Sequence, residues 1–150
     1  MVEVIDAIDR TLLRELAANG RATLAELAAS TGLSVSAVAA RVRRLESRGV
    51  VTGYAAQIDQ EAVGHLLSAF VAITPLDLSQ PDDAPARLEH FPEIESCQSV
   101  AGEESYILLV RVASPRALED LLQRIRTAAN VRTRSTIILQ TFYGGRQFIP

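Results

Sequence analysis

Residues 23–48 read TLAELAASTGLSVSAVAARVRRLESR, and this stretch decides how the first third of the chain folds. Thr23 and Glu26 form a capping box, in which each side chain accepts a hydrogen bond from the backbone N–H of the other residue, so a helix begins here. Gly32 provides the left-handed turn that ends this helix, and Ser34 caps the helix that follows. Ala28 is the small residue that two steeply crossing helices need at their contact. The stretch therefore predicts a helix-turn-helix.

One more helix precedes this pair, capped by Asp6 and ended by Asn19 and Gly20. Gly49 ends the third helix. The β-rich residues 50–58 are predicted to be a strand and linker, from which a wing would form. The first helix takes its apolar face from Ile5, Ile8, Leu12 and Leu16, and the third takes its own from Val35, Val38, Val42 and Leu45.

The outer side of the third helix suits a nucleic acid. Short side chains near the helix start let the backbone approach base edges in a major groove, and arginines further along reach phosphates or guanine. Residues 41–48 hold a local excess of three positive charges, although the net charge of the chain is −3. We therefore expect double-stranded DNA as a partner. The candidate contacts are Thr23, Ser34, Ser36, Ala37, Ala40, Arg41, Arg43, Arg44 and Arg48.

From residue 66 onward the pattern changes to short apolar strands. Ser114 and Pro115 form an N-cap followed by proline at the first helical position, and Asp83 begins an earlier, shorter helix. The longer helix is expected to bury Leu118, Leu122 and Ile125. Strands are predicted over residues 66–74, 94–101, 105–113 and 131–142.

The resulting order, β-α-β-β-α-β, is that of a ferredoxin-like domain. The chain is thus predicted to be α+β, with a helix-turn-helix domain over residues 1–50, a strand and linker over residues 51–65, and the ferredoxin-like domain over residues 66–150.

This sheet is predicted to lack a cover on one side. Both helices of such a domain lie on one face, yet the first strand has Val71 on one face and Phe70 on the other, and the third has Leu108 opposite Leu109. A strand that is apolar on both sides is buried on both sides. The sequence therefore predicts a homodimer in which a second copy covers the open face.

Enzyme chemistry finds little support in the sequence. His65 and His90 lie in different segments, and a lone histidine is more often a packing or surface residue. Cys97, in a predicted strand, is expected to be a buried small hydrophobe and leaves no partner for a disulfide. We find no phosphate loop, metal-spaced cluster or nucleophile elbow, and predict no metal or cofactor. Without a signal peptide or a run long enough to span a membrane, the chain is expected in the cytoplasm.

Four strings together carry a resemblance that covers nearly the whole chain: DAIDRTLLRELAANGR, LAELAASTGLS, RVRRLESRGVVTGY and SVAGEESYILLVRV. They resemble the Lrp/AsnC (leucine-responsive, feast/famine) family of transcriptional regulators. The resemblance implies a winged helix-turn-helix, a C-terminal domain of the RAM/ACT-like type that dimerises through its sheet, and further assembly of dimers into octamers. Family members often have prolines where this chain has Ser34 to Ala37, so the operator sequence does not carry over.

The resemblance also implies a small-molecule amino acid as effector, bound between dimers at the turn after the second strand. In the family, this turn usually has the sequence Gly-Asp-x-Asp-Tyr. Here Glu103, with a longer side chain, takes the place of the first aspartate, and Ser105 takes the place of the second. Thr136 and Gln140 match further effector positions. The candidate effector residues are Gly102, Glu103, Glu104, Ser105, Tyr106, Thr136 and Gln140. From its residues alone, the turn is more simply explained as an ordinary hairpin with a glycine at positive φ, and it is the resemblance that favours a ligand site. Tyr106 packs against either the ligand or the core.

Three functions therefore stay in competition. The first is a ligand-responsive transcription factor, and the second is an amino-acid-binding module that regulates an enzyme through protein contacts of its three helices. The third is a small enzyme on a ferredoxin-like scaffold. Four crowded arginines favour the first over the second, and the lack of a catalytic constellation weighs against the third.

Overall fold

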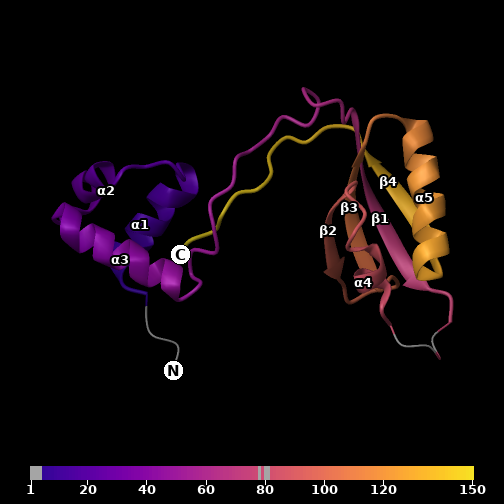
Figure 1. The fold of residues 1–150 in the computed structure, drawn as a ribbon, viewed down its shortest axis with the longest axis horizontal. Coiled ribbons are helices and arrows are strands. Elements are labelled where there is room, and N and C mark those ends of the chain that lie inside the picture. Colours follow the sequence, from indigo (N-terminus) through magenta and orange to yellow (C-terminus); the bar gives the residue numbers. More distant parts are fainter. Residues whose placement is uncertain (1–4, 78, 80–81) are drawn as a thin grey trace. The chain divides into compact units, whose positions relative to one another are not determined.

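The chain folds into two units (Figure 1). Residues up to 57 and residues 143–150 form the first, and Ile58–Phe142 form the second. The structure, a computed structural model, describes residues 5–150 except 78, 80 and 81. Within this described chain, no helix combines the length and apolarity needed to cross a bilayer.

Three helices make up most of the first unit: α1 (Ala7–Ala18), α2 (Leu24–Thr31) and α3 (Val35–Ser47). The predicted caps are confirmed. The Asp9 N–H donates to Asp6 at 2.7 Å, the capping box of α2 is complete, and the Ala37 N–H donates to Ser34 at 3.2 Å. Gly32 lies in the left-handed region, with a φ of 70°. The helix-turn-helix thus follows the local rules written in its sequence.

The core of the first unit is formed by Leu12, Leu27, Ala28, Val38 and Val42, with Leu33 packed against it. The prediction that Val35 points inward is wrong, because 48% of its surface is exposed. It is the first residue of α3, and the contact with α2 is made one turn further on, by Val38.

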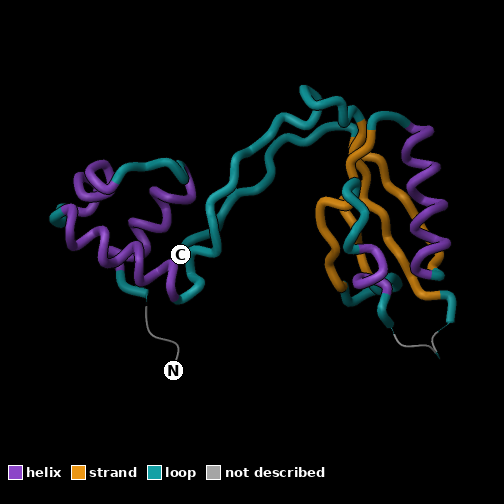
Figure 2. The backbone as a smooth tube through the Cα atoms, viewed as in Figure 1, coloured by secondary structure: helices purple, strands orange, loops and turns teal. Residues whose placement is uncertain are grey.

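The strand predicted over residues 50–58 is not formed. A strand forms only where its backbone is hydrogen-bonded to that of a neighbouring strand. Residues 50–57 run beside the C-terminal residues without forming such a strand (Figure 2). Together with α1, these two segments line a groove of about 980 Å³. Arg14 Nη2 donates to the Pro150 carbonyl at 3.0 Å. Residues 143–150, predicted to belong to the ferredoxin-like domain, group by their contacts with the helix-turn-helix.

The second unit has the predicted β-α-β-β-α-β order. Its antiparallel sheet has the strand order β2-β3-β1-β4. Both helices pack on one face of it and contact each other. The elements are β1 (Leu67–Pro75), α4 (Ala84–Leu88), β2 (Ile94–Ser99), β3 (Tyr106–Val112), α5 (Pro115–Ala129) and β4 (Val131–Ile138).

The helix-covered face of the sheet holds the core of this unit. Val71 and Leu108 are fully buried there, as predicted. In α5 the buried leucine between Leu118 and Ile125 is Leu121, whereas the predicted Leu122 is only half-buried. The two leucines are adjacent, and only contact with the sheet decides which one points at it. Asn130, at a φ of 52°, ends α5 and turns the chain into β4.

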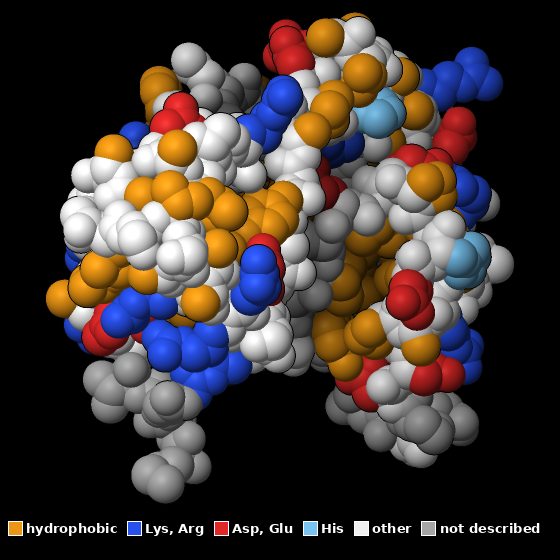
Figure 3. Space-filling view, turned by 60° about the vertical axis from the view of Figure 1, so that its left-hand side comes forward, with side chains coloured by type: hydrophobic (Ala, Val, Ile, Leu, Met, Phe, Trp, Pro, Cys, Tyr) orange, Lys and Arg blue, Asp and Glu red, His pale blue; other side chains and the backbone are white. Residues whose placement is uncertain are grey.

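No described residue packs over the other face of the sheet as the two helices do over the first. Phe70 is 47% exposed and is paired with Leu109 on β3 and with Thr136 on β4, so all three share this face. Hydrophobic side chains gather in the hollow of this unit in Figure 3. Arg111 pairs with Glu95 and donates to Ser68 Oγ at 2.9 Å within the chain. The open face is thus apolar at its centre.

Replacing Leu121 by alanine should lower the free energy of unfolding of the sheet unit by about 2–5 kcal/mol, because a fully buried leucine leaves a cavity. Leu122→Ala is the matched control and should cost less than half as much, since this side chain is half-buried. Urea denaturation of both variants measures the difference. Equal losses of the free energy of unfolding in the two variants would contradict the orientation of α5 in which Leu121, and not Leu122, faces the sheet.

Candidate functional site

The outer face of α3 carries a stripe of exposed positions spaced four, three and four residues apart: Ser36, Ala40, Arg43 and Ser47. This spacing places them on one side of a helix, opposite the buried Val38 and Val42. Arg43 has no ion-pair partner among the described residues. Its neighbours are small, so the helix backbone itself is accessible along this stripe.

A second stripe on α3, formed by Ala37, Arg41, Arg44 and Arg48, lies on the side of α1. Arg41 Nη1 donates to Asp6 Oδ2 at 2.6 Å and to Asp9 Oδ1 at 2.8 Å, and Arg44 Nη2 donates to Asp9 Oδ2 at 2.8 Å. Asp9 is only 2% exposed. Arg41 and Arg44, both predicted to contact DNA, are thus already ion-paired inside the unit. Basic side chains gather on this unit at the lower left of Figure 3.

This ion-pair network changes the electrostatics of its members. The pKa of Asp6 is lowered, first by the hydrogen bond from the Asp9 backbone and then by the one from Arg41. The pKa of Arg41 is raised by its hydrogen bonds to Asp6 and Asp9. The sequence predicts Asp6 only as a helix cap, and Asp9 is not among the predicted functional residues. The available signal was their three-residue spacing, which puts two carboxylates on the same side of α1.

The remaining candidates on this unit divide by what their side chains already do. The hydroxyls of Thr23 and Ser34 are engaged in the helix caps, and Ala37 is half-buried. Arg48 and Arg43 are both exposed at the surface. The unit therefore offers an exposed stripe of small residues around Arg43, with capped helix ends close to it in sequence.

In the sheet unit, the turn between β2 and β3 holds Gly102. A Cβ built on Gly102 would have nothing within 4 Å, and its φ lies outside the left-handed region. The hairpin explanation, a glycine needed for positive φ, is therefore wrong. Nothing within this chain requires a glycine at this position, which leaves room for another molecule to approach the backbone.

The acids of this turn have different surroundings. Glu104 forms an ion pair with Arg134 of β4, whereas Glu103 is exposed and has no described partner. The Ser105 N–H donates to the Ile73 carbonyl at 3.1 Å, which fixes the turn to the end of β1. Glu103 is thus the turn carboxylate that remains available to a ligand.

Tyr106 packs against the core on the helix-covered face. Its pKa is raised, chiefly by a hydrogen bond to Asp82. Of the two roles left open by the sequence, the structure supports the packing role. Thr136 is exposed on the open face. Gln140 lies beyond β4, which ends at Ile138, so the even-spacing argument that paired it with Thr136 does not apply.

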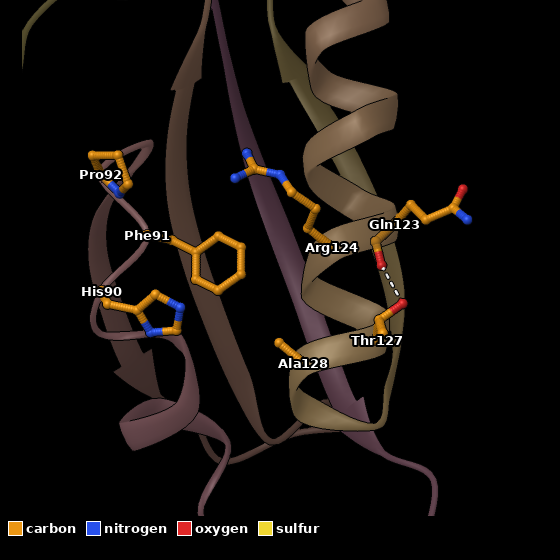
Figure 4. Close-up of a pocket in the computed structure, with 7 residues that line it drawn as sticks. All are labelled: His90, Phe91, Pro92, Gln123, Arg124, Thr127 and Ala128. Atoms are coloured by element: carbon orange, nitrogen blue, oxygen red, sulfur yellow. Dashed lines mark hydrogen bonds between the residues drawn. The ribbon is translucent and has the colours of Figure 1, made fainter.

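Other chemistry-bearing groups form no site. A shallow pocket of about 440 Å³ lies between α5 and residues 90–92 (Figure 4), where the Arg124 guanidinium sits 5.2 Å from the centre of the Phe91 ring. Cys97, predicted to be buried, is exposed because β2 is an edge strand. His65 is hydrogen-bonded to Gln60 at 2.9 Å. Within the described residues there is no cluster of three or more metal-ligating side chains.

Two protein families match the chain. A winged helix-turn-helix DNA-binding domain matches residues 5–52, and an Lrp/AsnC ligand binding domain matches residues 68–148. The first match lies within the helix-turn-helix unit, and the second covers the sheet unit from residue 68 and extends to residue 148 of the C-terminal segment. The chain is therefore a transcriptional regulator that joins a DNA-binding unit to a ligand-binding unit.

Individual relatives agree with this class. The HTH-type transcriptional regulator LrpA of Mycobacterium tuberculosis is 80% identical over 150 residues, which are 100% of both chains. Solved structures include the feast or famine regulatory protein from M. tuberculosis complexed with L-methionine and the Gly102→Thr mutant of that protein. Each has a TM-score of 0.96 and 80% identity, and covers 98% of this chain and 100% of its own. The chain belongs to the Lrp/AsnC family, whose members compared here are named as regulators and not as enzymes.

Proposed function

We propose that this chain binds double-stranded DNA through α3 and adjusts that binding to a free amino acid held near residues 102–106. It does so in the cytoplasm as a homo-oligomer, at least a dimer. DNA binding belongs to residues 1–50, residues 51–65 are the linker, and the effector and assembly functions belong to residues 66–142. The single observation that carries this proposal is the exposed stripe on α3, in which Arg43 stands among small residues and has no ion-pair partner in the part of the chain that the structure describes.

The geometry ranks the predicted DNA contacts. Ser36, Ala40 and Arg43 lie on the accessible stripe, so base edges and nearby phosphates are assigned to them. Arg41 and Arg44 already have carboxylate partners, and Arg44 keeps 42% of its side chain exposed. The edge of the DNA contact is assigned to residues near the helix starts, Thr23, Ser34 and Ala37. Arg48 is a further candidate at the C-terminal end of α3.

Arg43→Ala should weaken binding to the duplex upstream of the chain's own gene and flatten the plot of log affinity against log salt by roughly 0.9, the value for one lost phosphate contact. Arg116→Ala, an exposed arginine of α5, is the matched control and should change neither quantity. Mobility shift at several salt concentrations measures both. An unchanged affinity and slope in Arg43→Ala would show that this stripe is not the DNA contact.

The open face of the sheet supports the assembly part of the proposal. Phe70, Ile107 and Leu109 are apolar and are left without a cover in the chain itself, and a second copy of the same face is complementary to it. Further assembly of dimers into octamers follows the family resemblance.

Phe70→Asp should shift the full chain from dimer toward monomer at low micromolar concentration, because a carboxylate would be buried without a partner at the dimer contact. Gln123→Asp places the same charge on the helical face and should leave the dimer intact. Sedimentation velocity separates the two states. A wild-type chain that sediments as a stable monomer would contradict the sheet-mediated dimer.

The effector part rests on the turn and on the L-methionine complex of the relative. A free amino acid has an ammonium and a carboxylate. Glu103 is the available acid for the ammonium, and Glu104 is balanced by Arg134. Backbone N–H groups near Gly102 can meet the carboxylate, since no Cβ blocks their approach. Neither cavity described above is lined by this turn, so we propose that a neighbouring dimer completes the site, with Ser105 and Thr136 near it and Gln140 and Tyr106 at its edge.

Gly102→Thr should weaken amino-acid binding by tenfold or more, about 1.4 kcal/mol, because the added side chain blocks the approach to the backbone. The same mutant of the relative keeps the fold, so lost binding would not reflect unfolding. Ala113→Thr, at the far end of β3, is the control. Calorimetry with each of the twenty amino acids tests this. If none binds to the wild type, the sensor function is wrong, and if Gly102→Thr binds as well as the wild type, the turn does not contribute to a ligand site.

A further inference from the structure

We propose that Asp9, assisted by Asp6, determines how strongly the regulator discriminates between its operator and other DNA, by withholding Arg41 and Arg44 from DNA phosphates. This inference rests on the proposed role of α3 in DNA binding. Asp9 lies on α1, outside the helix that enters the groove, so a list of expected DNA contacts would not include it.

The contacts show how completely Asp9 is occupied. Both of its carboxylate oxygens accept a hydrogen bond from an arginine of α3, each at 2.8 Å. Its side chain is 3% exposed, while those of Arg41 and Arg44 are 26% and 42% exposed. Asp6 adds a second carboxylate to the same Arg41 nitrogen at 2.6 Å. A buried acid is thus neutralised by two arginines that reach the surface near the stripe of Arg43.

Carboxylate and phosphate oxygens compete for the same guanidinium donors. If Arg41 turned to a phosphate, the buried Asp9 would keep only Arg44, and if both arginines turned away it would be an unpaired buried charge, which is strongly unfavourable. Burial also protects these ion pairs from screening by salt. The phosphates of DNA therefore compete poorly for the two arginines, and Arg41, with two carboxylates, is held more firmly than Arg44.

The consequence falls mainly on non-specific binding. Non-specific DNA binding depends almost wholly on neutralised phosphates, whereas specific binding also uses base contacts. The net charge of residues 41–48 is +3, and it falls to +1 when the charges of Asp6 and Asp9 are added. Withholding two arginines lowers affinity for all DNA, but it removes a larger share of the binding to random sequence.

A purely structural role makes a different prediction. If the ion pairs only fasten α1 to α3, their loss lowers stability and weakens binding to every duplex, and no new phosphate contacts form. The slope of log affinity against log salt distinguishes the two roles, because it counts the phosphates that the protein neutralises.

The test uses fluorescence anisotropy of the full chain with a random-sequence duplex and with the duplex upstream of its own gene. For Asp9→Asn, the salt slope on the random duplex should steepen by about 0.9 for each arginine released. Affinity for the random duplex should rise about tenfold at 0.1 M salt, and the ratio of specific to non-specific affinity should fall. Adding Arg41→Gln and Arg44→Gln to Asp9→Asn should return the slope to the wild-type value, a result that a structural role does not produce.

Asp6→Asn provides the second variant in case Asp9→Asn does not fold. Asparagine caps a helix as well as aspartate does, and Asp6 is half exposed, so the fold should persist while Arg41 loses one carboxylate. A smaller steepening of the slope is expected. If the folded variants keep the wild-type slope or flatten it, the withholding role is wrong. An Arg43→Ala variant that binds normally would instead overturn the role of α3 itself, so the two failures are distinguishable.

Discussion

The four-stranded sheet is apolar on both faces, but the helices of its own chain cover only one of them. This constraint links the parts of the molecule. The covered face, centred on Val71 and Leu108, gives the unit its stability. The open face, centred on Phe70, is the one that a second copy of the chain is proposed to cover. In the proposed homodimer, the helix-turn-helix units come in pairs, and the proposed ligand site at Gly102 is completed by a neighbouring dimer.

The arginines of the DNA-binding unit have two different roles. Arg43 stands on an open stripe among small residues, where it is available to DNA. Arg41 and Arg44 are held by carboxylates of α1, where they join two helices and balance a buried acid. A count of arginines on α3 therefore overstates the charge that DNA meets. The unit binds a polyanion although the chain as a whole carries a net charge of −3.

Much of this fold could be predicted from the sequence because the decisive interactions are local. The caps at Asp6, Thr23 and Ser34, the turn at Gly32 and the alternation along β1 and β3 each depend on residues within a few positions of one another. The errors arise where a distant partner decides. Leu121 is buried in place of Leu122 because of the sheet, residues 50–58 find no strand to pair with, and Asp9 acquires its role from arginines more than 30 residues away.

The same division applies to the candidate sites. The α3 stripe was predictable from helical periodicity, whereas the freedom of Gly102 from any backbone requirement and the Glu104–Arg134 ion pair needed three dimensions.

The central claim is that two helix-turn-helix units bind DNA as a pair. Hydroxyl-radical footprinting of the full chain on the duplex upstream of its own gene tests this claim most directly. Two protected regions about 34 Å apart, one helical turn of DNA, are predicted for recognition helices in successive major grooves. A single protected region, or protection without this spacing, would contradict the account.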